Sequence, residues 1–283
     1  MSAAARPNWI VRWLVHLVTY AVALTMIAPF GWMISTSLKT NRRAIDPNPS
    51  LLPDGPLTQW QWHHYLEAWR RAQLGDFYLN SIIVAVVVTA LSVLFCAIAG
   101  FAFAKLRFAG RRITFAILLA TLLLPYQVYF IFAYFICSWL GYIDQLHALI
   151  VPFLASAFGI FYMRQSIVTV PDSLLDAGRI DGFTDFELFV NIIVPAVRPA
   201  LAALAIFTFM ASWNNFFWPL IVIDSSEHIT LPLAVERLSA GQFVDSWPQR
   251  MAAATIITVP TIFVFVLFQR SFVEGLALTG VKG

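Results

Sequence analysis

The chain has 283 residues, of which 60% are hydrophobic and 12% are charged; its net charge is +3 and its mean hydropathy is +0.76. A composition this apolar excludes an ordinary soluble globular domain. The sequence therefore predicts an all-α membrane protein that crosses the bilayer several times.

Long uncharged stretches recur along the chain. A bilayer core is about 30 Å thick and needs about 20 apolar helical residues to cross it. Because lipid cannot satisfy backbone polar groups, stretches of this length are expected to be helices. Six occur: Trp13 to Leu38, Phe77 to Ala104, Ile113 to Ser138, Leu146 to Met163, Ala200 to Ile223 and Met251 to Phe268. We interpret the first as a retained helix, since it is too long for a secretory signal.

The distribution of Lys and Arg predicts the orientation of these helices. The loop from Lys105 to Arg112 holds four basic residues and the loop from Trp139 to Gln145 holds none, so the first is expected in the cytoplasm. The loop from Arg164 to Pro199 and both termini then also face the cytoplasm. Of the 18 Lys and Arg residues, eleven lie inside and seven outside, mostly in the loop from Lys39 to Asp76.

The expected organisation is a single membrane domain, residues 13–272, between a cytoplasmic N-terminus, residues 1–12, and a cytoplasmic tail, residues 273–283. Its extracytoplasmic loop, residues 39–76, ends in an aromatic segment of the kind that anchors proteins at the membrane interface. Its long cytoplasmic loop is formed by residues 164–199.

The predicted spans contain no Asp, Glu, Lys or Arg. Ion-coupled carriers keep such groups in mid-membrane, so a secondary carrier is disfavoured, and no constellation for an intramembrane enzyme is present. Neutral polar and aromatic groups do occur within the third and fifth spans. They either bond across helices or line a pathway for a hydroxylated substrate. The candidates are Tyr126, Gln127, Tyr129, Trp213, Asn214 and Asn215.

The long cytoplasmic loop carries strong helix signals. Pro171 and Asp172 are typical of a helix start, and Gly182 is expected to end this helix in a left-handed conformation. Thr184 and Glu187 then have the spacing of a capping box, which predicts a second helix. Pro195 is expected to stop it.

Apolar residues of the second helix recur at helical spacing and predict one continuous stripe, formed by Phe186, Phe189, Val190 and Ile193. On the first helix, Leu174, Leu175 and Ala177 are expected to be exposed. The pair of helices could lie on lipid headgroups or bind a protein partner. Its acidic residues favour the protein, because an anionic membrane surface repels them.

At this loop the chain resembles the permease subunits of ATP-binding-cassette importers. Their pattern is Glu-Ala-Ala, three residues, Gly, nine residues, Ile, one residue, Leu-Pro. The same spacing occurs here in Asp176-Ala177-Gly178, Gly182, Ile192 and Val194-Pro195. Three of these positions depart from the usual residues: Asp176 stands for Glu, Gly178 for Ala and Val194 for Leu.

Further segments resemble the sugar-importer branch, specifically its shorter, maltose-type second permease subunit, and extend the resemblance over nearly the whole chain. They are Arg179 to Gly182, Pro199 to Ala202, Ser212 to Leu220 and Gly275 to Gly283. The resemblance implies a type I importer permease in a bacterial inner membrane, which forms half of a pathway for a di- or oligosaccharide. Glycerol-3-phosphate or a polyol is the alternative substrate.

The resemblance also implies the partners: a homologous second permease, two ATPase subunits and an extracytoplasmic sugar-binding protein, within membrane lipid and without nucleic acid. ATP and Mg would bind to the ATPases, so this chain is expected to be no enzyme and to hold no cofactor or metal. It has no phosphate-binding Gly-x-x-x-x-Gly-Lys-Ser/Thr loop. The surface that couples it to the ATPase is expected at Leu175, Asp176, Ala177, Gly178, Asp181, Gly182, Phe183 and Pro195.

Overall fold

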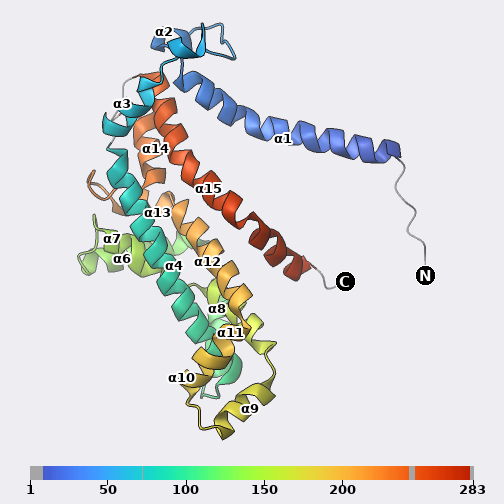
Figure 1. Cartoon of the computed structure of the whole chain (residues 1–283). Coiled ribbons are helices and arrows are strands. Elements are labelled where there is room, and N and C mark those ends of the chain that lie inside the picture. The colour runs from blue at the N-terminus through green and yellow to red at the C-terminus, as the bar shows by residue number, and fades with distance from the viewer. Residues whose placement is uncertain (1–8, 72, 242–245, 281–283) are drawn as a thin grey trace. The chain divides into compact units, whose positions relative to one another are not determined.

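The computed structural model describes residues 9–71, 73–241 and 246–280, and every regular element within these ranges is a helix (Figure 1). The all-α prediction is therefore confirmed. The chain forms two compact units, one from Met1–Leu74 and Val235–Val259 and the other from Gly75–Ala234 and Pro260–Gly283. The predicted end segments, residues 1–12 and 273–283, lie partly outside the described ranges.

Polar contacts join the helices of the first unit. Nδ1 of the buried His64 lies 2.9 Å from the carbonyl oxygen of Ser37, and the Ser37 hydroxyl lies 2.7 Å from the Tyr65 phenol oxygen. The Gln249 amide donates a hydrogen bond to the Glu67 carboxylate. The elements of this unit are α1 (Trp9–Ser37), α2 (Asn41–Ala44), η1 (Leu57–Gln59), α3 (His63–Arg71), most of α14 (Leu231–Ser239) and the first part of α15 (Trp247–Gly280).

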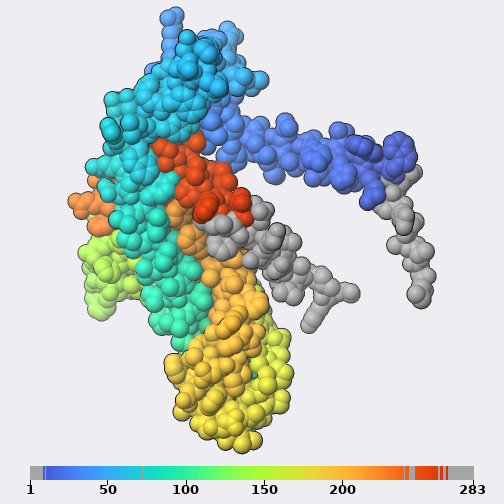
Figure 2. Space-filling model, in the orientation of Figure 1, coloured from blue at the N-terminus to red at the C-terminus, as the bar shows by residue number. Residues whose placement is uncertain are grey.

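The second unit is arranged along α4 (Leu74–Lys105). Figure 1 shows α9 and α10 beyond its Lys105 end and α6 and α7 beside its middle, and Figure 2 shows the segment from α9 to α11 as a rounded projection. The further elements are α5 (Arg111–Thr121), α6 (Tyr126–Trp139), α7 (Leu146–Ile150), η2 (Val151–Phe153), α8 (Ala157–Val168), α9 (Asp172–Ile180), α10 (Asp185–Leu188), the π-helical turn η3 (Phe189–Ile193), α11 (Val194–Ala196), α12 (Arg198–Trp213) and α13 (Phe217–Val222).

Among the described residues, three helices are long and apolar enough to cross a membrane, or up to five segments if two bent helix pairs are each counted as one span. The three are Val11–Ser37, Leu74–Lys105 and Leu146–Val168, which match the first, second and fourth predicted stretches. The helix α15 covers the sixth.

The third predicted stretch is not one continuous helix, so the sequence prediction is wrong there. The helix α5 ends at Thr121, and α6 starts at Tyr126 after a bend of 105°. Pro125 accounts for the break, because it lacks an N–H group and disfavours helical geometry at the preceding residue.

The fifth predicted stretch is interrupted as well. The helix α12 ends at Trp213, and a separate short helix, α13, follows from Phe217. At the break the Asn215 side-chain oxygen accepts a hydrogen bond from the backbone N–H of Trp218 at 3.4 Å. An Asn side chain that bonds nearby backbone in this way competes with a continuing helix.

A glycine allows α4 and α8 to pack closely. A Cβ at Gly100 would lie 2.8 Å from Cβ of Met163 and 2.9 Å from the backbone nitrogen of Arg164. Neither neighbour is a flexible side-chain end, so the helices would have to separate. We expect Gly100→Ala to lower the free energy of unfolding of the purified chain by about 1–3 kcal/mol. The loss should appear as a lower thermal unfolding midpoint in detergent.

The matched control is Gly31→Ala, within α1, where a Cβ would meet nothing within 4 Å. Alanine is the better helix former, so this variant should be neutral or slightly stabilised. Equal midpoints for the two variants would contradict the close-packing explanation.

Candidate functional site

The first helix of the loop from Arg164 to Pro199 ends in a left-handed glycine, as predicted. Gly182 has φ +88°. The N–H of Phe183 donates to the carbonyl of Gly178 at 2.9 Å, and the N–H of Gly182 donates to that of Arg179 at 3.1 Å. This pair of bonds is a Schellman motif, which satisfies the last carbonyls of α9 and turns the chain sharply.

The second helix starts at the predicted capping box. The N–H of Thr184 donates to the Glu187 carboxylate at 2.7 Å, and the N–H of Glu187 donates back to the Thr184 hydroxyl at 3.3 Å. The bond from the Thr184 backbone lowers the pKa of the Glu187 carboxyl. We call the segment from Asp172 to Ala196 the hairpin; both sides of its turn are held by backbone hydrogen bonds.

The hairpin's second helix ends at Ala196, one residue after Pro195, so the predicted stop is confirmed to within one residue. The helix passes through the π-helical turn η3 into α11, and after Ala196 the chain bends by 82° into α12. The extra residue of the π turn also divides the predicted apolar stripe. Phe189 and Ile193 are buried, whereas Phe186 and Val190 are exposed.

The predicted coupling residues separate into two groups. Leu175 is only 2% exposed and Gly178 is buried. The prediction that Leu175 is exposed is therefore wrong. Leu175 faces the interior because Leu188 and the helix α8 cover that side of α9. The remaining members are exposed, namely Asp176, Ala177, Asp181, Gly182, Phe183 and Pro195.

Exposed apolar side chains extend this surface beyond the predicted residues. Ile180 is 87% exposed and Phe186 is 71% exposed. Leu174, predicted to lie on the surface, is half exposed. Helical spacing could have indicated Ile180, because a helix that buries Leu175 and Gly178 directs the residue two positions after Gly178 outward. Arg179 lies 3.3 Å from Asp176 and 3.6 Å from Asp185, which links the two helices on the outside.

A buried apolar cluster lies beneath the hairpin. Leu188 and Ile193 are completely buried, and Phe189 contacts Phe101 of α4 with 5.5 Å between ring centroids. Met163 and Ile167 contribute from α8. The hairpin is thus packed on α4 and α8, and it does not lie free on the surface.

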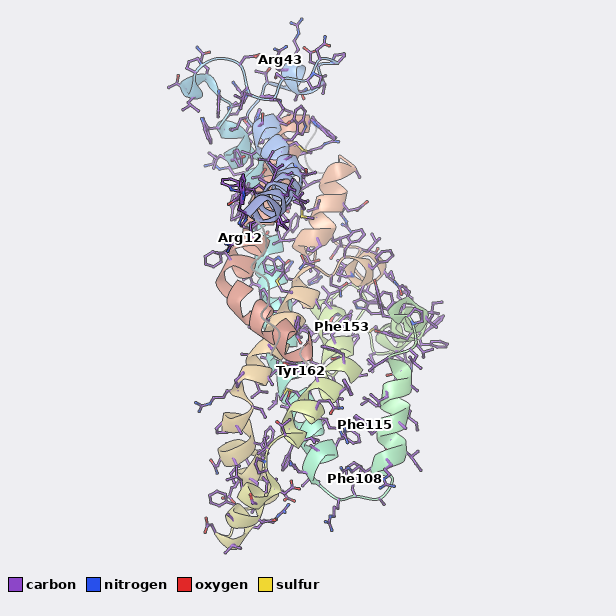
Figure 3. All side chains as sticks on the ribbon, turned by 90° about the vertical axis from the view of Figure 1, so that its right-hand side faces the viewer. Arg12, Arg43, Phe108, Phe115, Phe153 and Tyr162 are labelled. Carbon is purple, nitrogen blue, oxygen red and sulfur yellow. The ribbon has the colours of Figure 1, made fainter. Side chains whose placement is uncertain are left out.

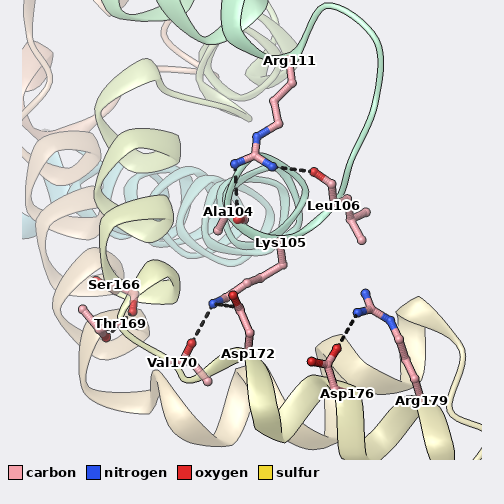
Figure 4. Close-up of polar contacts among 10 residues, drawn as sticks. All are labelled: Ala104, Lys105, Leu106, Arg111, Ser166, Thr169, Val170, Asp172, Asp176 and Arg179. Carbon is pink, nitrogen blue, oxygen red and sulfur yellow. Dashed lines mark hydrogen bonds and ion pairs between the residues drawn. The ribbon is translucent and has the colours of Figure 1, made fainter.

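Lys105, the last residue of α4, holds the start of the hairpin (Figure 4). Its ammonium nitrogen lies 2.6 Å from the carbonyl oxygen of Val170 and 2.6 Å from the Asp172 carboxylate. The hydrogen bond and the charge of Lys105 lower the pKa of Asp172. The ion pair is therefore intact at neutral pH and is lost as the pH falls through this lowered pKa.

An open cavity of about 940 Å³ lies between α4, α6, the segment from η2 to α8, and α12. Both helix breaks reach it, through Leu124 and Pro125 at one and Asn215 at the other. Its described lining has no charged side chain and presents hydroxyl, amide and aromatic groups: Ser92, Thr121, Tyr126, Tyr129, Tyr142, Ser156, Thr208, Ser212, Asn215 and Trp218.

Three of the six predicted pathway residues line this cavity: Tyr126, Tyr129 and Asn215. Gln127 lines a different hollow of about 490 Å³. Trp213 is buried and stacks on Phe209. Asn214 donates to the carbonyl of Met210 at 2.8 Å. The sequence did not indicate the small hydroxyl residues of the lining, because a single Ser or Thr in an apolar helix carries no distinguishing pattern.

Trp218 fixes one wall of the cavity. Its side chain is 1% exposed, and its ring N–H donates to the carbonyl of Ala148 at 2.8 Å. The ring also lies 5.1 Å from that of Phe130 between centroids. These contacts hold α13 against α6 and α7.

Comparison with known proteins shows the family of the chain. The family model described as "Binding-protein-dependent transport system inner membrane component" matches residues 92–277. An arabinooligosaccharide transport permease of Halalkalibacterium halodurans is 34% identical over 204 residues, 72% of this chain and 73% of the relative. A lactose transport permease of Rhizobium radiobacter is 31% identical, covering 94% and 96%. An sn-glycerol-3-phosphate transport permease of Agrobacterium fabrum is 30% identical, covering 95% and 97%.

Solved structures share the fold. A chain from a bacterial ABC transporter involved in the import of the acidic polysaccharide alginate superposes with a TM-score of 0.79 at 21% identity, covering 95% of this chain and 99% of that chain. A chain from an alginate ABC transporter in complex with an alginate-bound periplasmic protein gives 0.58 at 13% identity, covering 91% and 94%.

Substitutions at Gly182 test the effect of backbone strain alone, because a Cβ there would meet no atom within 4 Å and would not be crowded. A β-branched residue strongly disfavours positive φ, so Gly182→Val should weaken the turn by about 1–2 kcal/mol. Asn tolerates this conformation better, and Gly182→Asn should retain most of the stability. Hydrogen exchange of the backbone amides of Asp181, Gly182 and Phe183 measures the effect. Equal exchange rates in the two variants would argue against the strain explanation.

Proposed function

The chain belongs to the family of binding-protein-dependent transport system inner membrane components, and from this premise we propose how it transports a sugar. Its relatives include oligosaccharide and lactose transport permeases that match most of its length. The chain is accordingly a membrane-embedded permease of an ATP-binding-cassette sugar importer. The proposal concerns its topology, its coupling to ATP hydrolysis and the substrate that it accepts.

We propose six spans with both termini in the cytoplasm. The spans would be α1, α4, the bent pair α5 and α6, the segment from α7 to α8, the broken pair α12 and α13, and α15. The bent pair α5 and α6 and the broken pair α12 and α13 are interrupted where they line the cavity. Such breaks are tolerated in a membrane when the freed backbone groups face a pathway and not lipid. The basic loop from Lys105 to Arg112 supports the orientation.

The observation that carries the coupling mechanism is that one helix serves both sites. Ser92 of α4 lines the cavity, and Lys105 at the end of the same helix holds the hairpin. At the rise of an α-helix, these two positions lie about 20 Å apart. A displacement of the hairpin would therefore move the cavity wall, because a packed helix transmits motion as a rigid body.

The hairpin is the proposed contact for an ATPase subunit. Its exposed face combines apolar side chains, among them Ile180 and Phe186, with the carboxylates of Asp176 and Asp181. Apolar anchors with a polar rim are typical of protein interfaces. Two ATPase subunits would bind ATP and Mg, a homologous permease would complete the pathway, and an extracytoplasmic binding protein would deliver the sugar.

The substrate proposed for the cavity is a neutral di- or oligosaccharide. Aromatic rings and neutral hydroxyl and amide groups suit the faces and hydroxyls of sugars. A phosphate ester would require basic partners, and the described lining supplies none. Glycerol-3-phosphate, which a relative is named for, is therefore the weaker candidate.

Lys105→Met tests the coupling mechanism, because it keeps the long side chain but removes the bonds to Val170 and Asp172. In vesicles that contain all subunits, we expect at least a fewfold less sugar transported per ATP hydrolysed. Arg198→Met is the control, since Arg198 is exposed and has no side-chain partner among the described residues. Transport by wild type without ATP would overturn the proposed function, whereas an unchanged transport ratio in Lys105→Met would overturn only the role of α4.

The substrate proposal is tested by uptake competition in the same vesicles, with a set of neutral di- and oligosaccharides against glycerol-3-phosphate and uronic-acid oligosaccharides. We expect only neutral sugars to compete and Tyr129→Ala to reduce their uptake, because a ring in the cavity is lost. Competition by an anionic compound alone would contradict the proposal for the lining.

A further inference from the structure

A second hollow, separate from the cavity, lies where α4, α5 and α8 meet. Its volume is about 850 Å³, and four of its nine lining residues are arginines: Arg107, Arg111, Arg112 and Arg164. No acidic residue is among its described lining. Four positive charges around one hollow repel each other, so such an arrangement favours an anionic occupant.

Two of these arginines are held in place by the fold. Arg111 donates to the carbonyl oxygens of Leu106 at 2.8 Å and Ala104 at 3.5 Å, which anchors it to the end of α4 (Figure 4). Arg164 donates to the carbonyl of Phe103 at 3.2 Å, and its guanidinium lies 4.3 Å from the centre of the Phe115 ring. Each guanidinium still has unused N–H groups.

The other two arginines have no side-chain hydrogen bond or ion pair among the described residues. Arg107 lies in the loop after α4 and Arg112 in the first turn of α5, and both are exposed. The N-terminus of α5 has no side-chain cap, and the helix dipole adds positive potential at the same edge. A guanidinium group can donate two parallel N–H bonds to two oxygens of one phosphate.

An apolar row leads away from the hollow along α5. Ile113 lines the hollow and is 69% exposed, and Ile117, one turn further, is 62% exposed. Phe108 is also exposed, and Figure 3 shows it in the loop that leads to α5, with Phe115 on α5 above it. A charged end joined to an apolar row matches an amphiphile, whereas a soluble anion or an acidic protein side chain would use only the charged end.

We propose that this hollow binds the phosphate headgroup of an anionic phospholipid, with an acyl chain along Ile113 and Ile117. The location of the hollow at the end of membrane helices rests on the proposed function. Bound lipid would hold α5 against the ends of α4 and α8, next to the Lys105 contact that anchors the hairpin.

The test is native mass spectrometry of the detergent-purified importer, or of this chain where partners dissociate, titrated with phosphatidylglycerol and with phosphatidylcholine of the same acyl chains. The variant is Arg107→Gln with Arg112→Gln. The charge-matched control is Arg42→Gln with Arg198→Gln, since both residues are exposed and have no side-chain partner in the part of the chain that the structure describes.

We expect wild type and control to retain phosphatidylglycerol at least about tenfold more tightly than phosphatidylcholine, and the variant to lose most of this preference. Ile113→Asn should weaken phosphatidylglycerol binding without a change of charge. Equal losses in variant and control would overturn the site, because they would show a general effect of net charge.

Two further results would also overturn the proposal. Displacement of the lipid by millimolar inorganic phosphate, with no effect of Ile113→Asn, would indicate a soluble-anion site. Lipid binding that disappears when an ATPase subunit is added would indicate a protein contact instead. None of these readouts depends on transport, so failure of the lipid site and failure of the proposed function are distinguishable.

Discussion

The packing of the hairpin on α4 and α8 is the constraint on which the second unit depends. Leu188 and Ile193 can be buried only if α10 and η3 lie directly against the other helices, and Leu175 brings α9 to the same cluster. Gly178 is buried where α9 meets Leu188. A Cβ there would come within 2.6 Å of a methyl carbon at the flexible end of the Leu188 side chain, which would have to move aside.

That contact lies at a departure from the family pattern. The usual residue at position 178 is alanine, and glycine by itself lowers helix propensity by about 1 kcal/mol. Here the side-chain ends of Leu188, Ile192 and Phe183 lie around the position of the missing methyl, and the complete burial of Leu188 helps to offset the weaker helix. The replacement of Glu by Asp176 has a different effect. Asp176 is exposed and paired with Arg179, so its side chain, shorter than that of Glu, alters the surface and leaves the packing intact.

The same helix ends that support the hairpin also produce the basic hollow. Lys105, Arg111 and Arg164 all donate to backbone carbonyls at or beside the end of α4 or at the start of the hairpin. The bonds to Phe103 and Ala104 satisfy carbonyls that the last turn of α4 leaves open. The basic residues that the sequence predicts on the cytoplasmic side thus have a structural role here.

Local features were predictable from the sequence because they depend on neighbouring residues. The apolar stretches, the left-handed conformation of Gly182 and the capping box of Thr184 and Glu187 all follow from short-range sterics and hydrogen bonding. The tertiary structure decided which side of each helix is buried. It placed Leu175 inside and Ile180 outside, joined Tyr126, Tyr129 and Asn215 in one cavity, and excluded Gln127 from it. These outcomes depend on partners tens of residues away and on bends of the chain, for which a periodic apolar pattern carries no signal.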